Sequence, residues 1–130
     1  MRFARWVFLI AGIYGIAVIF PQYFLEARVG RDYPPAITHP EYFYGFIGVG
    51  LAWQVAFLIV ASNPARFRPI MLTGIMEKLL FAFPVHLLAH HGLAPSILNL
   101  FAAIDVLLAV LFAAAYSRVG AENARGQRPG

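Results

Sequence analysis

The chain has 130 residues and a mean hydropathy of +0.71, with 61% hydrophobic and only 12% charged residues. A folded soluble domain of this length keeps roughly a third of its unfolded surface exposed, so it could not remove this much apolar surface from water, and the surplus must face lipid. The absence of cysteine excludes disulfides and thiolate metal sites. The formal net charge of +4 comes from basic residues scattered near the ends of apolar runs, which indicates a membrane protein and no nucleic-acid partner.

Four apolar runs are each long enough to cross a bilayer as a helix, which takes about 20 residues. The runs are continuous rather than alternating, so they favour helices over the strands of a membrane barrel. We therefore predict an all-α fold, a four-helix transmembrane bundle formed by residues 1–119 and followed by a polar, flexible tail at 120–130. The predicted helices span residues 3–25, 42–62, 69–90 and 97–116.

The connections and the basic residues predict how the helices are arranged in the membrane. The last two connections are short, so the helices that they join should be antiparallel neighbours. Arg28 and Arg31 lie in the longer first connection, residues 26–41. Because basic residues accumulate on the cytoplasmic side, the arginines of the opposite side place both termini in the cytoplasm. These number seven: Arg2, Arg5, Arg66, Arg68, Arg118, Arg125 and Arg128.

Charged and polar residues lie in the middle of the apolar runs. Glu77 and Lys78 are adjacent in the third run, and Asp105 lies at a similar depth in the fourth. Charged groups in hydrocarbon are costly, so they usually face the interior of a bundle and often mark function. Gln54 and Tyr14 reach a similar depth, so each helix brings a polar group to one layer.

Helical spacing predicts the direction of these side chains. Asp105 shares a face with Ala102 and Ala109, and Lys78 shares a face with Gly74. Small residues mark close contacts between helices in membranes. We therefore expect both charges on packing faces, where Lys78 and Asp105 form an ion pair.

Glu77 is the member of this layer without an obvious partner. Adjacent helical residues point about 100° apart, so we do not expect Glu77 to pair with Lys78. Glu77 would then need Gln54, Tyr14 or a proton. Three roles remain open for the layer: polar contacts that fix the helix register, a pocket for a ligand, or a path for protons or ions.

A second group of polar residues lies on the predicted outer face. His86 and His90 are four residues apart on one helix face, a spacing that suits a metal or haem, but no HExxH motif accompanies them. We expect no metal and no cofactor, and a response to pH is the alternative. The group consists of His39, Glu41, His86, His90 and His91.

Small residues and prolines complete the pattern. Gly48, Ala52 and Ala56 form a stripe on the second predicted helix, which we expect to pack against another helix of the chain, with a homodimer face as the alternative. Pro21 and Pro84 should bend their helices. Pro84 follows the charged layer and would widen the outer half of the bundle into a cavity.

Residues 39–46 (HPEYFYGF), 52–54 (AWQ), 77–78 (EK) and 104–105 (ID) resemble segments of small bacterial four-helix membrane proteins without an assigned role. In length and helix layout the chain is also distantly similar to the DoxX-like and EXPERA-like bundles. The EXPERA-like resemblance implies sterol isomerisation or binding, with Glu77 and Asp105 as the acidic residues of a mid-membrane pocket. The DoxX-like resemblance implies a link to respiratory or redox membrane complexes.

These observations predict a multi-pass protein of the bacterial inner (cytoplasmic) membrane whose polar layer binds a hydrophobic small molecule such as a lipid, quinone or isoprenoid. The alternatives are an accessory subunit of a larger membrane complex and an isomerase-like enzyme in which Glu77 or Asp105 moves a proton. Catalysis is the less favoured reading, and no catalytic residue is assigned.

Overall fold

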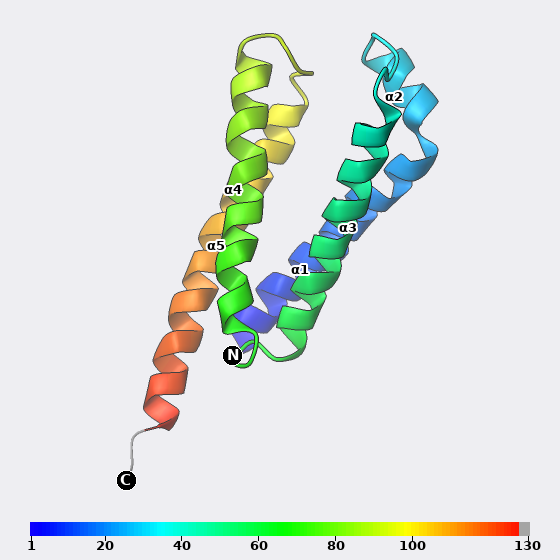
Figure 1. Cartoon of the computed structure of the whole chain (residues 1–130). Helices are drawn as coiled ribbons and strands as arrows, with labels where there is room; N and C mark the ends of the chain where they lie inside the picture. Colours follow the sequence, from blue (N-terminus) through cyan, green and yellow to red (C-terminus); the bar gives the residue numbers. More distant parts are fainter. Residues whose placement is uncertain (128–130) are drawn as a thin grey trace.

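A computed structural model of the chain describes residues 1–127, and within this range all regular structure is helical. Four helices are long, and a 3₁₀ helix and one short α-helix join the first two of them (Figure 1). Arg128 and the end of the predicted tail lie outside the described residues. The elements are α1 (Arg2–Ile19), η1 (Phe20–Phe24), α2 (Glu26–Asp32), α3 (Pro40–Ser62), α4 (Arg68–His90) and α5 (Leu98–Gly126).

The four long segments confirm the predicted membrane class. Arg2–Phe24, Pro40–Ser62, Arg68–His90 and Leu98–Gly126 are each long and apolar enough to cross a bilayer. Many of their large apolar side chains are exposed on the protein surface, as expected where lipid rather than water is the surrounding solvent. The chain is therefore an all-α, multi-pass membrane protein.

Two helix boundaries differ from the prediction. The α-helical part of the first span ends at Ile19, because Pro21 lacks an amide hydrogen and its ring obstructs a continuing α-helix. The last helix continues beyond Tyr116 to Gly126 and takes in most of the predicted flexible tail. Residues 117–126 are more polar than the rest of α5, but a helix outside the bilayer needs good helix formers rather than apolar residues. This part of α5 is also tied to the start of α1, because Glu122 pairs with the amino group of Met1.

The helices form two antiparallel pairs that meet at one end and separate at the other (Figure 1). One pair is α1 with α3, and the other is α4 with α5. We call the end that holds the start of α1, the turn at residues 63–67 and the last half of α5 the closed end. The opposite end, with η1, α2 and the turn at residues 91–97, is the open end.

This arrangement corrects the expectation that each short turn joins two antiparallel neighbours. The short turn between α4 and α5 does join antiparallel neighbours, as expected. The even shorter turn between α3 and α4 does not, because these two helices diverge from it and pack against different partners. A short connection fixes where two helices start, while the side chains along them decide whether they stay together.

An aromatic core holds the two pairs together near the closed end. Phe8, Phe57 and Phe112 are fully buried and come from α1, α3 and α5. The ring centroids of Phe8 and Phe112 are 4.1 Å apart, and those of Phe57 and Phe112 are 4.9 Å apart. Helix α4 reaches this core through Gly74, where a Cβ atom would lie 3.0 Å from Phe57.

The close approach of α1 and α3 uses different small residues from those predicted. In the stripe on α3, Ala52 is exposed, whereas Gly48 and Ala56 are half-buried and a Cβ atom on Gly48 would lie 3.4 Å from the hydroxyl of Tyr23, so the stripe packs within the chain only in part. The small residues at the contact lie on α1, where a Cβ atom on Gly12 would lie 2.9 Å from the carbonyl oxygen of Gln54. The face of α3 that packs instead carries Ile47, Gly50 and Gln54.

Candidate functional site

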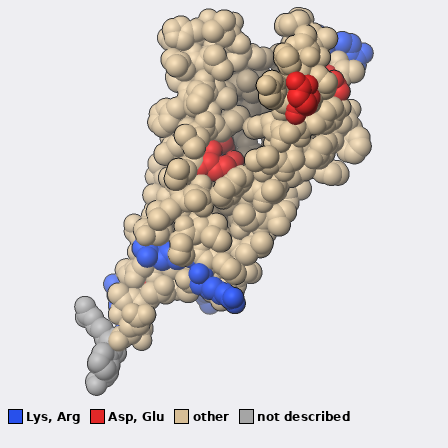
Figure 2. All heavy atoms as spheres, in the orientation of Figure 1, with Lys and Arg blue, Asp and Glu red and all other residues tan. Residues whose placement is uncertain are grey.

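A cleft of about 670 Å³ separates α3 from α4 on the open side of the molecule. Figure 2 shows it as a hollow between the two helix pairs, with acidic atoms at its floor. Among the described residues that line it, Glu77 is the charged one. The lining consists of Gly45, Phe46, Val49, Gly50, Trp53, Thr73, Met76, Glu77, Leu80, Phe81, Pro84 and Val85.

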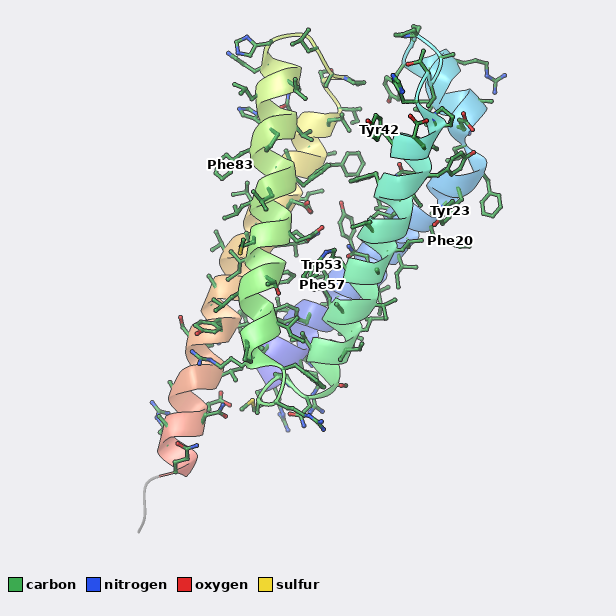
Figure 3. All side chains as sticks on the ribbon, viewed as in Figure 1. Phe20, Tyr23, Tyr42, Trp53, Phe57 and Phe83 are labelled. Atoms are coloured by element: carbon green, nitrogen blue, oxygen red, sulfur yellow. The ribbon has the colours of Figure 1, made fainter. Side chains whose placement is uncertain are left out.

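Aromatic side chains shape the walls of this cleft. Trp53 extends from α3 into the gap between the helix pairs, whereas Phe83 points away from it on the outer side of α4 (Figure 3). Nearer the open end, the rings of Phe46 on α3 and Phe81 on α4 stack with centroids 6.0 Å apart. Side chains from the two pairs therefore face each other across the cleft without closing it.

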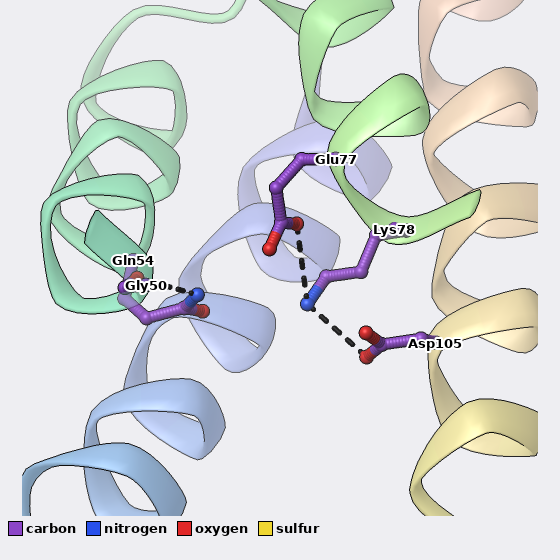
Figure 4. Close-up of polar contacts among 5 residues, drawn as sticks. All are labelled: Gly50, Gln54, Glu77, Lys78 and Asp105. Atoms are coloured by element: carbon purple, nitrogen blue, oxygen red, sulfur yellow. Dashed lines mark hydrogen bonds and ion pairs between the residues drawn. The ribbon is translucent and has the colours of Figure 1, made fainter. Parts of the chain in front are cut away.

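Lys78 lies between two carboxylates at the floor of the cleft (Figure 4). Its Nζ donates to Oδ1 of Asp105 at 3.1 Å, which confirms the predicted ion pair between α4 and α5. Lys78 is only 4% exposed, and Gly74, Ala102 and Ala109 around the pair are also buried. The small residues on these faces thus let the two helices approach closely enough for the pair to form.

The prediction that Glu77 and Lys78 do not interact is wrong. Oε2 of Glu77 lies 3.5 Å from Nζ of Lys78 (Figure 4). The angle between adjacent residues fixes only their Cα–Cβ directions, and the four-carbon stem of lysine lets its ammonium group swing back toward the neighbour. Glu77, Lys78 and Asp105 are therefore one ionic triad.

The contact between Glu77 and Lys78 is nevertheless incomplete. At 3.5 Å it is longer than a good hydrogen bond. Among residues 1–127, no group forms a hydrogen bond with Oε2 of Glu77, although this oxygen is buried. The other carboxylate oxygen points away from Lys78, toward α3 (Figure 4). Glu77 therefore brings unused hydrogen-bond acceptors to the cleft.

The aromatic core supports the triad from the closed end. Nζ of Lys78 lies 5.4 Å from the ring centroid of Phe57, within the range of a cation–π contact. Phe57 is fully buried and packs against Phe112. The lysine is thus held between two carboxylates and an aromatic face.

Gln54 and Tyr14 form no hydrogen bond with the triad within residues 1–127. Gln54 is fully buried, and its Nε2 donates to the carbonyl oxygen of Gly50 in its own helix at 3.0 Å. Its Oε1 packs against Gly15 of α1 and has no hydrogen-bond partner in the described part of the chain. Tyr14 packs against the hydrophobic core. Of the five candidates for the layer, the structure therefore brings together Glu77, Lys78 and Asp105.

The predicted outer polar group divides between the two helix pairs. His39 and Glu41, whose Nδ1 and Oε1 are 3.0 Å apart, lie at the start of α3. The three remaining histidines lie on the last turns of α4 and just after it, at the tip of the other pair (Figure 1). There Nδ1 of His86 lies 2.9 Å from Oδ1 of Asn99. Within residues 1–127, no three histidine, aspartate or glutamate side chains are arranged to hold a metal.

The sequence contains a signal for the cleft walls that is independent of the charged residues. Gly45, Val49 and Trp53 follow each other at intervals of four residues on α3, so they share one helix face. Glu77 and Pro84 are separated by two turns on α4 and share a face in the same way. These two faces are the ones that form the cleft.

No family model matches the chain, and neither a curated protein nor a solved structure matches it. The resemblance to DoxX-like and EXPERA-like bundles is therefore not supported. The evidence for a function therefore comes from the geometry of the cleft and of the triad.

Proposed function

We propose that this membrane protein binds a hydrophobic small molecule in the cleft between α3 and α4. One observation carries the proposal: Oε2 of Glu77 has no hydrogen-bond partner within residues 1–127, and its carboxylate lies at the floor of an otherwise largely apolar cleft. The volume of about 670 Å³ lies within the usual range for small-molecule sites. The apolar part of the ligand lies along the walls, and its polar head lies at Glu77. A lipid, a quinone in its reduced form or an isoprenoid alcohol has this shape and carries a hydrogen-bond donor at its head.

The position of Glu77 favours a ligand over a purely structural role. A single ion pair between Lys78 and Asp105 is enough to tie α4 to α5 and to fix their register. Glu77 adds a second carboxylate on the side of Lys78 that faces the cleft. A charged group in hydrocarbon is costly. Helix packing does not require the charge of Glu77, whereas binding of a ligand head would.

We propose that the closed end faces the cytoplasm of a bacterium and that the cleft opens in the outer half of the inner membrane. The start of α1 and the end of α5 both lie at the closed end (Figure 1), where blue basic side chains gather (Figure 2). This asymmetry agrees with the positive-inside rule. Reporter fusions after Arg31 should read as periplasmic, and fusions after Arg68 and Arg118 as cytoplasmic. A cytoplasmic signal at Arg31 would contradict the orientation.

Two substitutions of exposed valines on α3 test the binding site. Val49 is 64% exposed and lines the cleft, whereas Val55 is 49% exposed and does not line it. Val49→Trp fills the cleft, and Val55→Trp adds the same side chain elsewhere on the helix. Native mass spectrometry after purification in a mild detergent should detect a bound molecule in the unmodified protein and in Val55→Trp, but not in Val49→Trp.

The same experiment separates the alternatives. If the proteins carry no small molecule and copurify with a larger complex that Val49→Trp disrupts, the cleft receives a helix of a partner and the protein is an accessory subunit. If a bound molecule persists in Val49→Trp, the cleft is not its site. An isomerase-like role requires in addition that the bound molecule be converted and that Glu77→Gln stop the conversion while binding persists.

A further inference from the structure

We infer that the cleft selects a lipophilic molecule whose head donates hydrogen bonds, and that a long-chain protonated amine binds best. This inference rests on the proposed function and specifies its ligand class. Three features of the site carry it: the charge balance of the triad, the supply of free acceptors and the aromatic walls.

The charge balance is the first feature. Lys78 is the only lysine or arginine between Arg68 and Arg118, and it lies between Glu77 and Asp105 at 3.5 and 3.1 Å. With all three groups ionised, one cation faces two carboxylates and the triad lacks one positive charge. An uncompensated charge away from water is strongly unfavourable, so Glu77 needs either a proton or a cation, and a ligand that brings the missing cation can take the place of the proton.

The supply of acceptors is the second feature. Oε2 of Glu77 has no hydrogen-bond partner among the described residues, and the nearby hydroxyl of Thr73 already donates to the carbonyl oxygen of Ile70 at 2.8 Å. The side-chain amide of Gln54 donates within its own helix. Pro84 has no amide hydrogen, so the carbonyl of Leu80 lacks the donor that it would otherwise have in the helix. Leu80, Pro84 and Glu77 all line the cleft, which therefore needs donors from its ligand.

The aromatic walls are the third feature. Trp53, Phe46 and Phe81 line the cleft, and the face of an aromatic ring attracts a cation. A fatty acid or a phosphate head would instead bring a further negative charge toward two carboxylates. A neutral alcohol donates one hydrogen bond but supplies no charge. The expected order of affinity is therefore amine, then alcohol, then carboxylate.

Three amphiphiles of equal chain length test this order: dodecylamine, dodecanol and dodecanoate. Trp53 lines the cleft and the other tryptophan is Trp6, so in Trp6→Phe the tryptophan fluorescence reports on the cleft alone. In this background, dodecylamine should bind about tenfold or more tightly than dodecanoate, as expected for a charge-assisted contact. Val49→Trp should be tested by native mass spectrometry, where loss of the complex shows that the amine binds in the cleft rather than in the detergent.

The variant Glu77→Gln tests whether the carboxylate of Glu77 causes the preference for the amine. It keeps the shape of the side chain and removes its charge, so the preference for the amine over the acid should fall to about twofold or less. Glu122→Gln is the matched control, because it makes the same change in an exposed residue at the closed end and should preserve the preference. If Glu77→Gln does not fold, the order of the three amphiphiles in the unmodified cleft decides the question.

The outcomes distinguish the inference from the proposed function. Binding of dodecanoate as tight as that of dodecylamine, or a preference for the amine that survives Glu77→Gln, would overturn the inference while leaving the cleft as a binding site. If none of the three amphiphiles binds in a manner that Val49→Trp abolishes, the proposed function itself fails. The expected order, its loss in Glu77→Gln and its retention in Glu122→Gln together support both.

Discussion

The closed end and the open end consist of the same four helices, but their side chains meet in opposite ways. At the closed end, buried phenylalanines from three helices stack, and Gly74 lets the fourth helix approach them. At the open end, the side chains that face across the gap are large and partly exposed, as Phe46 and Phe81 illustrate. Phenylalanines face each other at both ends, so the comparison teaches that ring size alone does not hold these helices together: at the closed end a glycine lets the next helix approach the rings and bury them.

The ionic triad lies at the boundary between the two regions. On its closed side, Lys78 faces the ring of Phe57 in the core. On its open side, Glu77 faces the cleft. A buried ion pair adds little net stability to a protein, but the protein loses much stability when one partner of the pair is removed. The triad can therefore hold α4 on α5 while leaving the other pair free to diverge.

The largest expected effect comes from breaking the closed end. Phe112→Ala should lower the free energy of unfolding by about 3–5 kcal/mol, because it removes a fully buried ring from the stack and leaves a cavity. Phe83→Ala is the control, since Phe83 points away from the bundle (Figure 3) and should change little. Unfolding in mixed micelles by titration with a denaturing detergent measures both. Similar losses for the two variants would contradict the difference between the regions.

Removing one partner from the boundary should have the next largest effect. Lys78→Met should destabilise the protein by about 3 kcal/mol, because it leaves the carboxylate of Asp105 buried without a cation. The double change Lys78→Met with Asp105→Leu should recover most of this loss. The same unfolding assay, arranged as a double-mutant cycle, checks this. Losses that simply add would mean that the two residues stabilise the protein independently.

A glycine in the tight contact between α1 and α3 gives a smaller effect. In Gly12→Ala the new methyl group would lie 2.9 Å from the carbonyl oxygen of Gln54. This is backbone and cannot move without shifting the helix, so we expect a loss of about 1–3 kcal/mol. A variant as stable as the unmodified protein would show that α1 and α3 have room to adjust.

The same substitution in the cleft wall should act in the opposite direction. At Gly45 an added Cβ atom would have no neighbour within 4 Å. Gly45→Ala should therefore stabilise the protein by about 0.5–1 kcal/mol, because alanine loses less chain entropy than glycine in a helix. Because Gly12→Ala and Gly45→Ala add the same methyl group, comparing their stabilities tests whether the open end has free space that the contact between α1 and α3 lacks. A loss of stability would indicate that the cleft is narrower than described.

Much of the fold and part of the site could be predicted from the sequence. The lengths of the apolar runs gave four spans, and the small residues one turn from Lys78 and Asp105 identified the faces on which these charges pair. The prediction failed where an apolar pattern cannot separate a face toward lipid from a face toward protein. This is why the stripe around Ala52 was expected to pack, although α3 packs through Ile47 and Gly50.

The other incorrect predictions concern features that the spacing of residues along one helix does not determine. The contact of Glu77 with Lys78 depends on the freedom of a long side chain, which the 100° rule for adjacent residues ignores. The divergence of α3 from α4 depends on which partners their faces find after a short turn. The extension of α5 to Gly126 lies outside the apolar run, where hydropathy carries no information on helix length.

The cleft opens between the two helix pairs (Figure 2), and the direction of this opening decides whether a ligand enters from lipid or from water. A site that opens into the bilayer takes its ligand from the membrane, in which an amphiphile is already far more concentrated than in water. Part of the apparent affinity measured from water is then the free energy of partitioning into lipid, about 0.8 kcal/mol for each buried CH₂ group. The protein has to recognise only the head. If the proposed ligand binds at Glu77, a modest intrinsic affinity would be enough to keep the cleft occupied, and a ligand too polar to enter the membrane would be excluded before it reached the protein.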